Sequence, residues 1–166
     1  MHNNVVATIV RALKERGIAA LAFNFRGAGG SEGSFDNGVG ERDDARAALA
    51  YAASLPGIEK VGLAGYSFGA GIAAAVVDQS TAGLCLVSLP SRAPAEDAAV
   101  RRYAGPVLFI SGDQDSVSSL EVIHELAPSL PGETEIVTVA GADHFWWGYE
   151  RNLDQAMKSF FARLFS

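Results

Sequence analysis

The sequence predicts an α/β fold in which a mostly parallel sheet carries helices on both faces. Apolar runs typical of strands alternate with apolar stripes at helical spacing along nearly the whole chain, which is the pattern of a covered parallel sheet. The chain has 166 residues, 49% hydrophobic and 19% charged, so we expect one globular domain over residues 1–166. A domain of this size buries about 68–70% of its unfolded surface, which is enough for a core.

The first third of the chain predicts a helix, a strand and a second helix. The first helix ends at Gly17, a favourable C-cap, and a strand follows over residues 19–25. The second helix is expected to begin after an N-cap at Asp36 or Asn37 and to end before Pro56. The apolar stripes of the two helices are Val6, Ile9, Val10 and Leu13, and Ala45, Ala48, Leu49 and Ala52.

The rest of the chain predicts strands and helices in alternation. Strands are expected over Val61–Tyr66, 84–89, 107–110 and Thr134–Val139, and a run of small residues over 70–79 indicates a helix. Another helix, shortened by Pro128, follows the third of these strands. The C-terminal helix has the strongest stripe and should pack on the sheet. The stripes of these last two helices are Ile123, Leu126, Ala127 and Leu130, and Leu153, Ala156, Met157, Phe160, Phe161 and Leu164.

A G-x-S-x-G pentapeptide stands between the strand Val61–Tyr66 and the next helix. Its residues are Gly65, Tyr66, Ser67, Phe68 and Gly69. This sequence in a strand–turn–helix setting is the pattern of a nucleophile elbow. A serine on so tight a turn has strained backbone angles, and glycines two positions to either side let the strand and the helix approach each other. Ser67 is therefore the candidate nucleophile.

Candidates for a base and an acid follow two later strands. A serine hydroxyl is a poor nucleophile near neutral pH and needs a histidine base that is oriented by a carboxylate. Asp113 and Asp115 follow the strand 107–110, and His144 follows the strand Thr134–Val139. Open parallel sheets place their chemistry just past the carboxyl ends of their strands. The order serine, acid, histidine is also that of elbow-containing hydrolases.

His144 is the choice among three histidines. His2 is at the terminus and His124 lies within a predicted helix, so both are expected to be structural or solvent-facing. The acid is harder to choose, because Asp113 and Asp115 lie two positions apart in one loop. We favour Asp115 and expect Asp113 to bond the backbone of its own loop.

Together these motifs resemble the α/β-hydrolase superfamily over nearly the whole chain. The segment Asn24 to Gly33 and the sequence Glu-Arg-Asp-Asp at residues 41–44 add to the resemblance. The pattern is similar to that of a small bacterial branch of hydrolases without a large lid. In that branch the acid is the second aspartate of a Gly-x-x-Asp segment, which corresponds to Asp115.

The resemblance implies a serine hydrolase, and a carboxylesterase for small soluble esters in particular. Only residues 90–105 separate two consecutive predicted strands, which is too short for a large lid. In the expected reaction His144 takes the proton of Ser67, and Asp115 orients the imidazole. The backbone N–H of Phe68, at the start of a helix, stabilises the oxyanion. No metal or organic cofactor is required.

The sequence departs from the superfamily at its beginning. Superfamily members normally have two or three strands before their first helix, whereas this sequence starts almost inside that helix. One such strand usually lies between the strand 19–25 and the elbow strand, and the loop after it carries a second oxyanion donor. Three expectations follow: direct pairing of residues 19–25 with the elbow strand, a strand from a partner chain in a homo-oligomer, or a fragment of a longer protein, which we favour. The alternative function is a catalytically incomplete or assembly-dependent hydrolase-fold remnant.

Composition argues against several other classes of protein. The net charge of −6 argues against nucleic-acid binding. No apolar run reaches the roughly 18 residues of a membrane span and no signal peptide opens the sequence, so we expect no membrane partner and a cytoplasmic location.

The glycine run from Gly27 has Glu32 where a dinucleotide fingerprint needs its last glycine, so we expect a loop with positive φ at the site mouth. The lone Cys85 is expected to be a buried hydrophobe.

Two further features near the site have two interpretations each. Arg26 either contacts substrate or pairs with Asp43, Asp44 or a backbone carbonyl, and we favour pairing. The three aromatic residues after His144 either wall an acyl pocket or, for two of the three, pack in the core. They are Phe145, Trp146 and Trp147.

Overall fold

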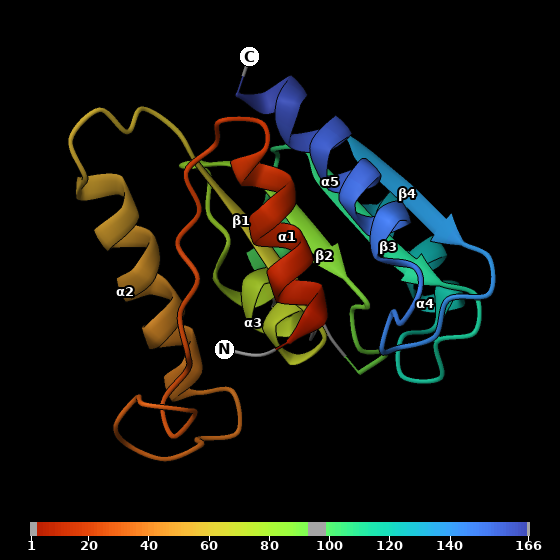
Figure 1. Cartoon of the computed structure of the whole chain (residues 1–166), viewed down its shortest axis with the longest axis horizontal. Helices are drawn as coiled ribbons and strands as arrows, with labels where there is room; N and C mark the ends of the chain where they lie inside the picture. Colours follow the sequence, from red (N-terminus) through yellow and green to blue (C-terminus); the bar gives the residue numbers. More distant parts are fainter. Residues whose placement is uncertain (1–2, 93–98, 166) are drawn as a thin grey trace.

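The computed structural model describes residues 3–92 and 99–165 and contains a parallel sheet of four strands. The strands lie in sequence order across the sheet (Figure 1): β1 (Val61–Tyr66), β2 (Thr81–Val87), β3 (Val107–Gly112) and β4 (Thr134–Val139). Each strand pairs in parallel with its neighbour, so all four carboxyl ends meet at one edge. His2 lies outside the described residues, and no described helix has the length and apolar character to cross a bilayer.

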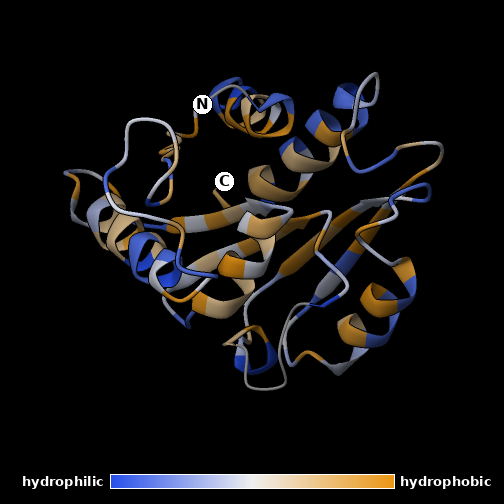
Figure 2. Ribbon diagram, turned by 90° about the horizontal axis from the view of Figure 1, so that it is seen from below, coloured by the Kyte–Doolittle hydropathy of each residue, from blue (hydrophilic) through white to orange (hydrophobic). Residues whose placement is uncertain are grey.

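Helices cover both faces of the sheet, as predicted. On one face lie α1 (Asn4–Lys14) and α5 (Glu150–Leu164), and on the other lie α3 (Phe68–Val76) and α4 (Leu120–Leu126). Figure 2 shows these two layers above and below a largely apolar sheet. The helix α2 (Gly40–Ser54) lies beyond β1 and contacts α3. Two short 3₁₀ helices, η1 (Ala99–Arg102) and η2 (Ala127–Ser129), complete the described elements.

The core has two halves because successive residues of a strand point to opposite faces. Leu84, Leu86 and Phe109 pack toward α3 and α4, whereas Cys85 and Leu108 pack toward α1 and α5. All five are completely buried. Burial on both faces explains why β2 and β3 are nearly continuous apolar runs in the sequence.

Residues 19–25 form no strand, contrary to the prediction for this segment. Within the described residues the sheet ends at β1, so the expected direct pairing of residues 19–25 with β1 is wrong as well. Phe23 and Phe25 instead pack against a small cluster formed by Ala45, Ile72 and Val76. An extended apolar run becomes a strand only where a neighbouring strand accepts its backbone hydrogen bonds.

Several element boundaries differ from the predicted ones. The helix α2 begins at Gly40, and its N-cap position is Val39 rather than Asp36 or Asn37. Asp36 still accepts the N–H of Gly40, at 3.0 Å, while Glu41 accepts the N–H of Asp36, at 2.7 Å. The ends of β2 and α3 come two and three residues earlier than predicted, at 87 and 76. The predicted strand 84–89 had therefore included Ser88, which lies beyond β2.

Candidate active site

Ser67 occupies the tight turn between β1 and α3. Its φ of 52° and ψ of −121° are unfavourable for a residue with a side chain. The turn is tight enough that a Cβ on Gly65 would lie 2.3 Å from the carbonyl oxygen of Gly69, so only glycine fits at Gly65. A Cβ on Gly69 would meet no neighbouring element within 4 Å, so steric approach does not require the second glycine, contrary to the sequence argument.

Ser67, His144 and Asp115 lie within hydrogen-bond distance in series. The Oγ of Ser67 is 2.9 Å from Nε2 of His144, and Nδ1 of His144 is 3.0 Å from each carboxylate oxygen of Asp115. The side chain of Asp115 is completely buried, and that of His144 is 13% exposed. A carboxylate at Nδ1 favours the tautomer with its proton there, which leaves Nε2 free to accept a proton from the serine hydroxyl.

The loops that carry Asp115 and His144 are in direct backbone contact. A Cβ on Gly112 would lie 2.0 Å from the carbonyl oxygen of Ala142, so the loops could not approach this closely with a larger residue there. Asp113 accepts the N–H of Gly141 at 2.7 Å. Asp113 therefore bonds the backbone of the histidine loop, and our prediction that it bonds the backbone of its own loop is wrong. Asp115, and not Asp113, contacts His144.

The surroundings of Asp115 favour its ionised form. Burial by itself would raise the pKa of this carboxyl. The hydroxyl of Ser88, the backbone N–H groups of Ser118 and Val117, and His144 all hydrogen-bond to it, and their combined effect holds its pKa below the ordinary value. The two N–H groups each lie 2.9 Å from Oδ1. A charged Asp115 can stabilise an imidazolium at His144.

Tyr66 is a site residue that the sequence analysis missed. Its hydroxyl donates to the backbone carbonyl of His144 at 2.7 Å, so it ties β1 to the histidine loop. Burial raises the pKa of Tyr66, and the negative charges of Asp115 and Asp143 raise it further, so the hydroxyl keeps its proton. In the sequence, the feature that could have identified Tyr66 is its position at the carboxyl end of β1, directly before Ser67.

Phe68 is the first residue of α3. The first N–H groups of a helix have no partner within the helix, and the helix dipole favours negative charge there. The N–H of Phe68 thus lies where the prediction requires an oxyanion donor. The Phe68 ring is 5.7 Å from that of Phe25 and 5.5 Å from that of Phe35. The glycine-rich segment before Phe35 has positive φ at Gly27, Gly29 and Gly33, as expected.

The aromatic residues after His144 divide differently from the prediction. Trp146 is completely buried, whereas Phe145 is 60% and Trp147 70% exposed. Only Trp146 therefore packs in the core, whereas the prediction had allowed core packing for two of the three residues. The Phe145 ring meets the imidazole of His144 edge to face, with centroids 5.8 Å apart, so it borders the site.

Arg26 pairs with Asp44, in agreement with the favoured interpretation. Its Nη2 lies 2.7 Å from Oδ1 of Asp44, and its backbone N–H donates to Oδ2 at 2.9 Å. These hydrogen bonds hold the pKa of Asp44 below its ordinary value. Asp43 instead bonds Arg46, at 2.9 Å. The pair fixes the start of the glycine-rich segment to α2.

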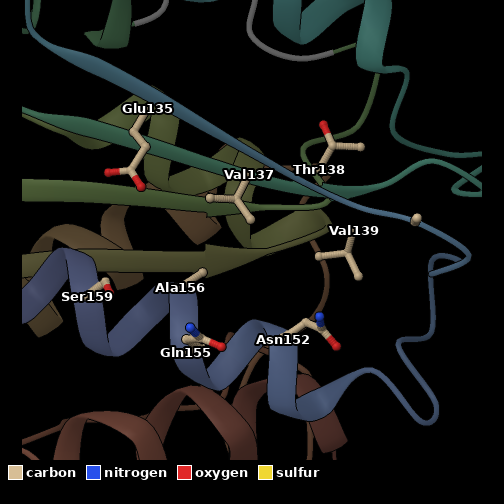
Figure 3. Close-up of a pocket in the computed structure, with 9 residues that line it drawn as sticks. Glu135, Val137, Thr138, Val139, Asn152, Gln155, Ala156 and Ser159 are labelled. Carbon is tan, nitrogen blue, oxygen red and sulfur yellow. The ribbon is translucent and has the colours of Figure 1, made fainter.

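The remaining candidates take no part in this arrangement. Cys85 is buried, which raises the pKa of its thiol, and its Sγ lies 3.2 Å from Sδ of Met157. His124 is exposed on α4. Across residues 3–92 and 99–165, no three His, Cys, Asp or Glu side chains form a group that could hold a metal. A hollow of about 410 Å³ between β4 and α5 (Figure 3), lined in part by Glu135, Asn152 and Gln155, includes none of Ser67, Asp115 and His144.

Comparisons with known proteins agree on one family. The model of the alpha/beta hydrolase family matches residues 43–156. An alpha-beta serine hydrolase homologue from Coxiella burnetii is 37% identical, with 96% of this chain and 77% of that chain covered and a TM-score of 0.86. A serine hydrolase without a lid from Xanthomonas campestris is 32% identical, with 98% and 74% covered and a TM-score of 0.88.

A curated relative differs in length. The protein RP471 of Rickettsia prowazekii is 32% identical in an alignment of 162 positions that covers 88% of this chain and 66% of the length of that protein. The esterase Est1E of Butyrivibrio proteoclasticus, solved with ferulic acid, is 20% identical with a TM-score of 0.87 over 98% of this chain and 84% of that chain. The likeness to Est1E is one of fold.

Proposed function

We propose that this chain, which belongs to the alpha/beta hydrolase family, is a serine carboxylesterase that acts on small soluble esters. One observation carries the proposal: the hydrogen-bonded series from Ser67 through His144 to Asp115, with contacts of 2.9 and 3.0 Å. A nucleophile, a base and an orienting acid in this order form the set that acyl transfer requires. Only residues 88–106 separate β2 from β3, and this segment is too short to form a large lid over the site. The short connection supports a small substrate that reaches Ser67 directly.

In the proposed reaction Ser67 attacks the ester carbonyl carbon while His144 Nε2 accepts the hydroxyl proton. The carbonyl oxygen becomes an oxyanion that accepts a hydrogen bond from the N–H of Phe68. Collapse of the tetrahedral intermediate breaks the bond to the alcohol oxygen, which leaves with the proton from His144. A water molecule then attacks the acyl-enzyme with the same proton transfers, and the carboxylic acid is released from Ser67.

A second candidate is a catalytically incomplete or assembly-dependent hydrolase-fold protein. Two observations favour it: the outer edge of β1 has no strand beside it in the described sheet, and the backbone of Phe68 is the single oxyanion donor that we identify. Loss of one oxyanion donor costs about 10²–10³ in turnover. A partner chain that supplies a strand next to β1 would make activity depend on protein concentration.

The test compares p-nitrophenyl acetate hydrolysis by the purified chain and by the Ser67→Ala variant, with the oligomeric state recorded on the same samples. Fluorophosphonate labelling is measured in parallel, and Ser129→Ala, an exposed serine of η2, is the matched control. The carboxylesterase proposal expects turnover and labelling in the wild type and in Ser129→Ala, and neither in Ser67→Ala. Labelling without turnover favours the incomplete site. Labelling that survives in Ser67→Ala excludes Ser67 as the nucleophile and overturns the carboxylesterase proposal.

A further inference from the structure

The carboxylate of Asp115 has a second side-chain partner besides His144. The hydroxyl of Ser88 hydrogen-bonds to it, and the Nε1–H of Trp146 donates to Oγ of Ser88 at 2.9 Å. Ser88 and Trp146 are both completely buried. A continuous chain of hydrogen bonds therefore runs from Trp146 through Ser88, Asp115 and His144 to Ser67.

The direction of the outer bonds follows from the chemistry of the groups. An indole N–H can only donate, so Oγ of Ser88 must accept from Trp146. A carboxylate can only accept, so the hydroxyl proton of Ser88 must point at Asp115. With Trp146 as its donor, the Ser88 hydroxyl has one orientation that satisfies both bonds, with its proton directed at Asp115. A hydroxyl fixed in this way is a preorganised donor to the charged form of Asp115.

The backbone holds Ser88 between the strands that carry the nucleophile and the acid. The residue lies just past β2, and its N–H donates to the carbonyl oxygen of Ile110 in β3 at 2.8 Å. The carbonyl of the preceding residue, Val87, accepts the N–H of Ser67 at 2.9 Å. Ser88 is therefore fixed relative to both Ser67 and the Asp115 loop.

Strained backbone conformations coincide with this chain of hydrogen bonds. Among the described residues, four that are not glycine have positive φ, and three of them are Ser67, Ser88 (49°) and Trp146 (63°). Such conformations cost stability and persist where the surrounding structure imposes them, frequently at functional sites. The fourth, Asn37, lies in the loop before α2 and has the residue type that tolerates this region best.

Trp146 also gives the histidine loop a second attachment to the same carboxylate. His144 binds Asp115 directly through Nδ1, and Trp146, two residues later, binds it through Ser88. Two attachments restrict both the distance and the rotation of the imidazole relative to Asp115. A single hydrogen bond would leave the imidazole freer to turn away from Ser67.

We propose that Ser88 and Trp146 are positioning residues that hold Asp115 and His144 in the geometry needed to activate Ser67. This inference rests on the function proposed above. Both residues are completely buried, so we expect neither to touch the substrate, and their loss should lower kcat while KM changes little. The expected size is that of a hydrogen bond to a charged group for Ser88, about 10–100-fold in kcat, and of a neutral one for Trp146, about 2–10-fold.

The experiment measures kcat and KM for p-nitrophenyl acetate in Ser88→Ala, Ser88→Gly, Trp146→Phe and the double variant Ser88→Ala/Trp146→Phe. Glycine removes the hydroxyl and also relieves the positive φ, so it separates the role of the hydroxyl from that of backbone strain. Thr81→Val is the matched control, because Thr81 is also a buried hydroxyl residue but lies at the amino end of β2, where its hydroxyl bonds Asp78. A second readout, the downfield proton resonance of His144 Nδ1–H, requires no turnover.

The proposal expects similar kcat losses in Ser88→Ala and Ser88→Gly, near wild-type kcat in Thr81→Val, and a shifted or exchange-broadened Nδ1–H resonance in both Ser88 variants. Trp146→Phe should have no further effect once Ser88 is alanine, because both act through one hydroxyl. Wild-type kcat together with an unchanged resonance in Ser88→Ala overturns the inference while the esterase stands. If the wild type shows no Ser67-dependent turnover, the proposed function fails, and the resonance in the Ser88 variants alone decides the positioning role.

Discussion

The two sides of the molecule differ in how their backbones are supported. β2 and β3 have a neighbour on each side, and their apolar residues are buried on both faces. Residues 18–39 lead from α1 to α2 with no regular secondary structure, and much of this segment is exposed, including Leu21 and Phe35. We call the four strands β1 to β4 together the paired sheet, and residues 18–39 the unpaired segment.

The candidate catalytic residues and the aromatic residues beside Ser67 are held in place by different parts of the molecule. Ser67, Asp115 and His144 all follow strands of the paired sheet, where ladders and close backbone contacts fix the loops. The unpaired segment places the ring of Phe35 against that of Phe68, beside Ser67. The ion pair between Arg26 and Asp44 attaches the same segment to α2. We therefore expect kcat to fall after small changes in the paired sheet and to change little after substitutions in the unpaired segment.

The largest effect is expected at the acid. Asp115→Asn should lower kcat for p-nitrophenyl acetate by about 10⁴-fold, because the amide favours the wrong imidazole tautomer and cannot stabilise the imidazolium. Asp113→Asn is the matched control: it keeps an oxygen that can accept the N–H of Gly141 and should retain nearly full activity. The reverse ranking in steady-state kinetics would identify Asp113 as the acid.

The next effect concerns packing. Leu86→Ala, near the carboxyl end of β2, should lower the free energy of unfolding by about 2–5 kcal/mol, because it leaves a cavity in a fully buried site. Leu21→Ala, in the unpaired segment and 49% exposed, should change it by no more than about 0.5 kcal/mol. Urea denaturation followed by circular dichroism measures both. Equal losses would show that the unpaired segment is as tightly packed as the sheet.

The charge on Asp115 predicts a dependence of stability on acid pH. Its pKa is lower in the folded state than the unfolded value of about 3.9, so its contribution is fully present above that pH and is lost as pH falls through the folded pKa. Each unit of lowering contributes about 1.4 kcal/mol. Asp115→Asn has no such contribution to lose, so its unfolding free energy should approach that of the wild type below about pH 4. A constant difference from pH 6 to pH 3 would refute the assignment.

The smallest effect concerns the attachment of the unpaired segment to α2. Asp44→Asn removes the charge that holds Arg26, so limited proteolysis within residues 26–38 should become several-fold faster. Asp43→Asn, whose exposed partner is Arg46, is the matched control and should be cleaved at the wild-type rate. Turnover should change little in either variant. Equal cleavage rates in all three proteins would mean that the pair does not order this segment.

The sequence predicted the paired sheet well, because its signals are local. The four strands from Val61 to Val139 were located within a few residues, since each is an apolar run bounded by turn residues. Ser67, Asp115 and His144 could be chosen because each follows a strand end within a short motif. The segment 19–25 carried the same local signal, and the prediction failed there because a strand also requires a partner.

By itself the sequence determined the fold class, the turn at Ser67 and the order in which the three candidate catalytic residues follow their strands, because hydrophobic period and strand-end position are properties of short stretches of chain. Only the tertiary structure decided which atoms meet: Asp113 with Gly141 rather than its own loop, Tyr66 with the carbonyl of His144, and Trp146 with Ser88. These contacts join residues between 28 and 78 positions apart. Their partners depend on how the loops at the sheet edge pack together, which no local pattern encodes.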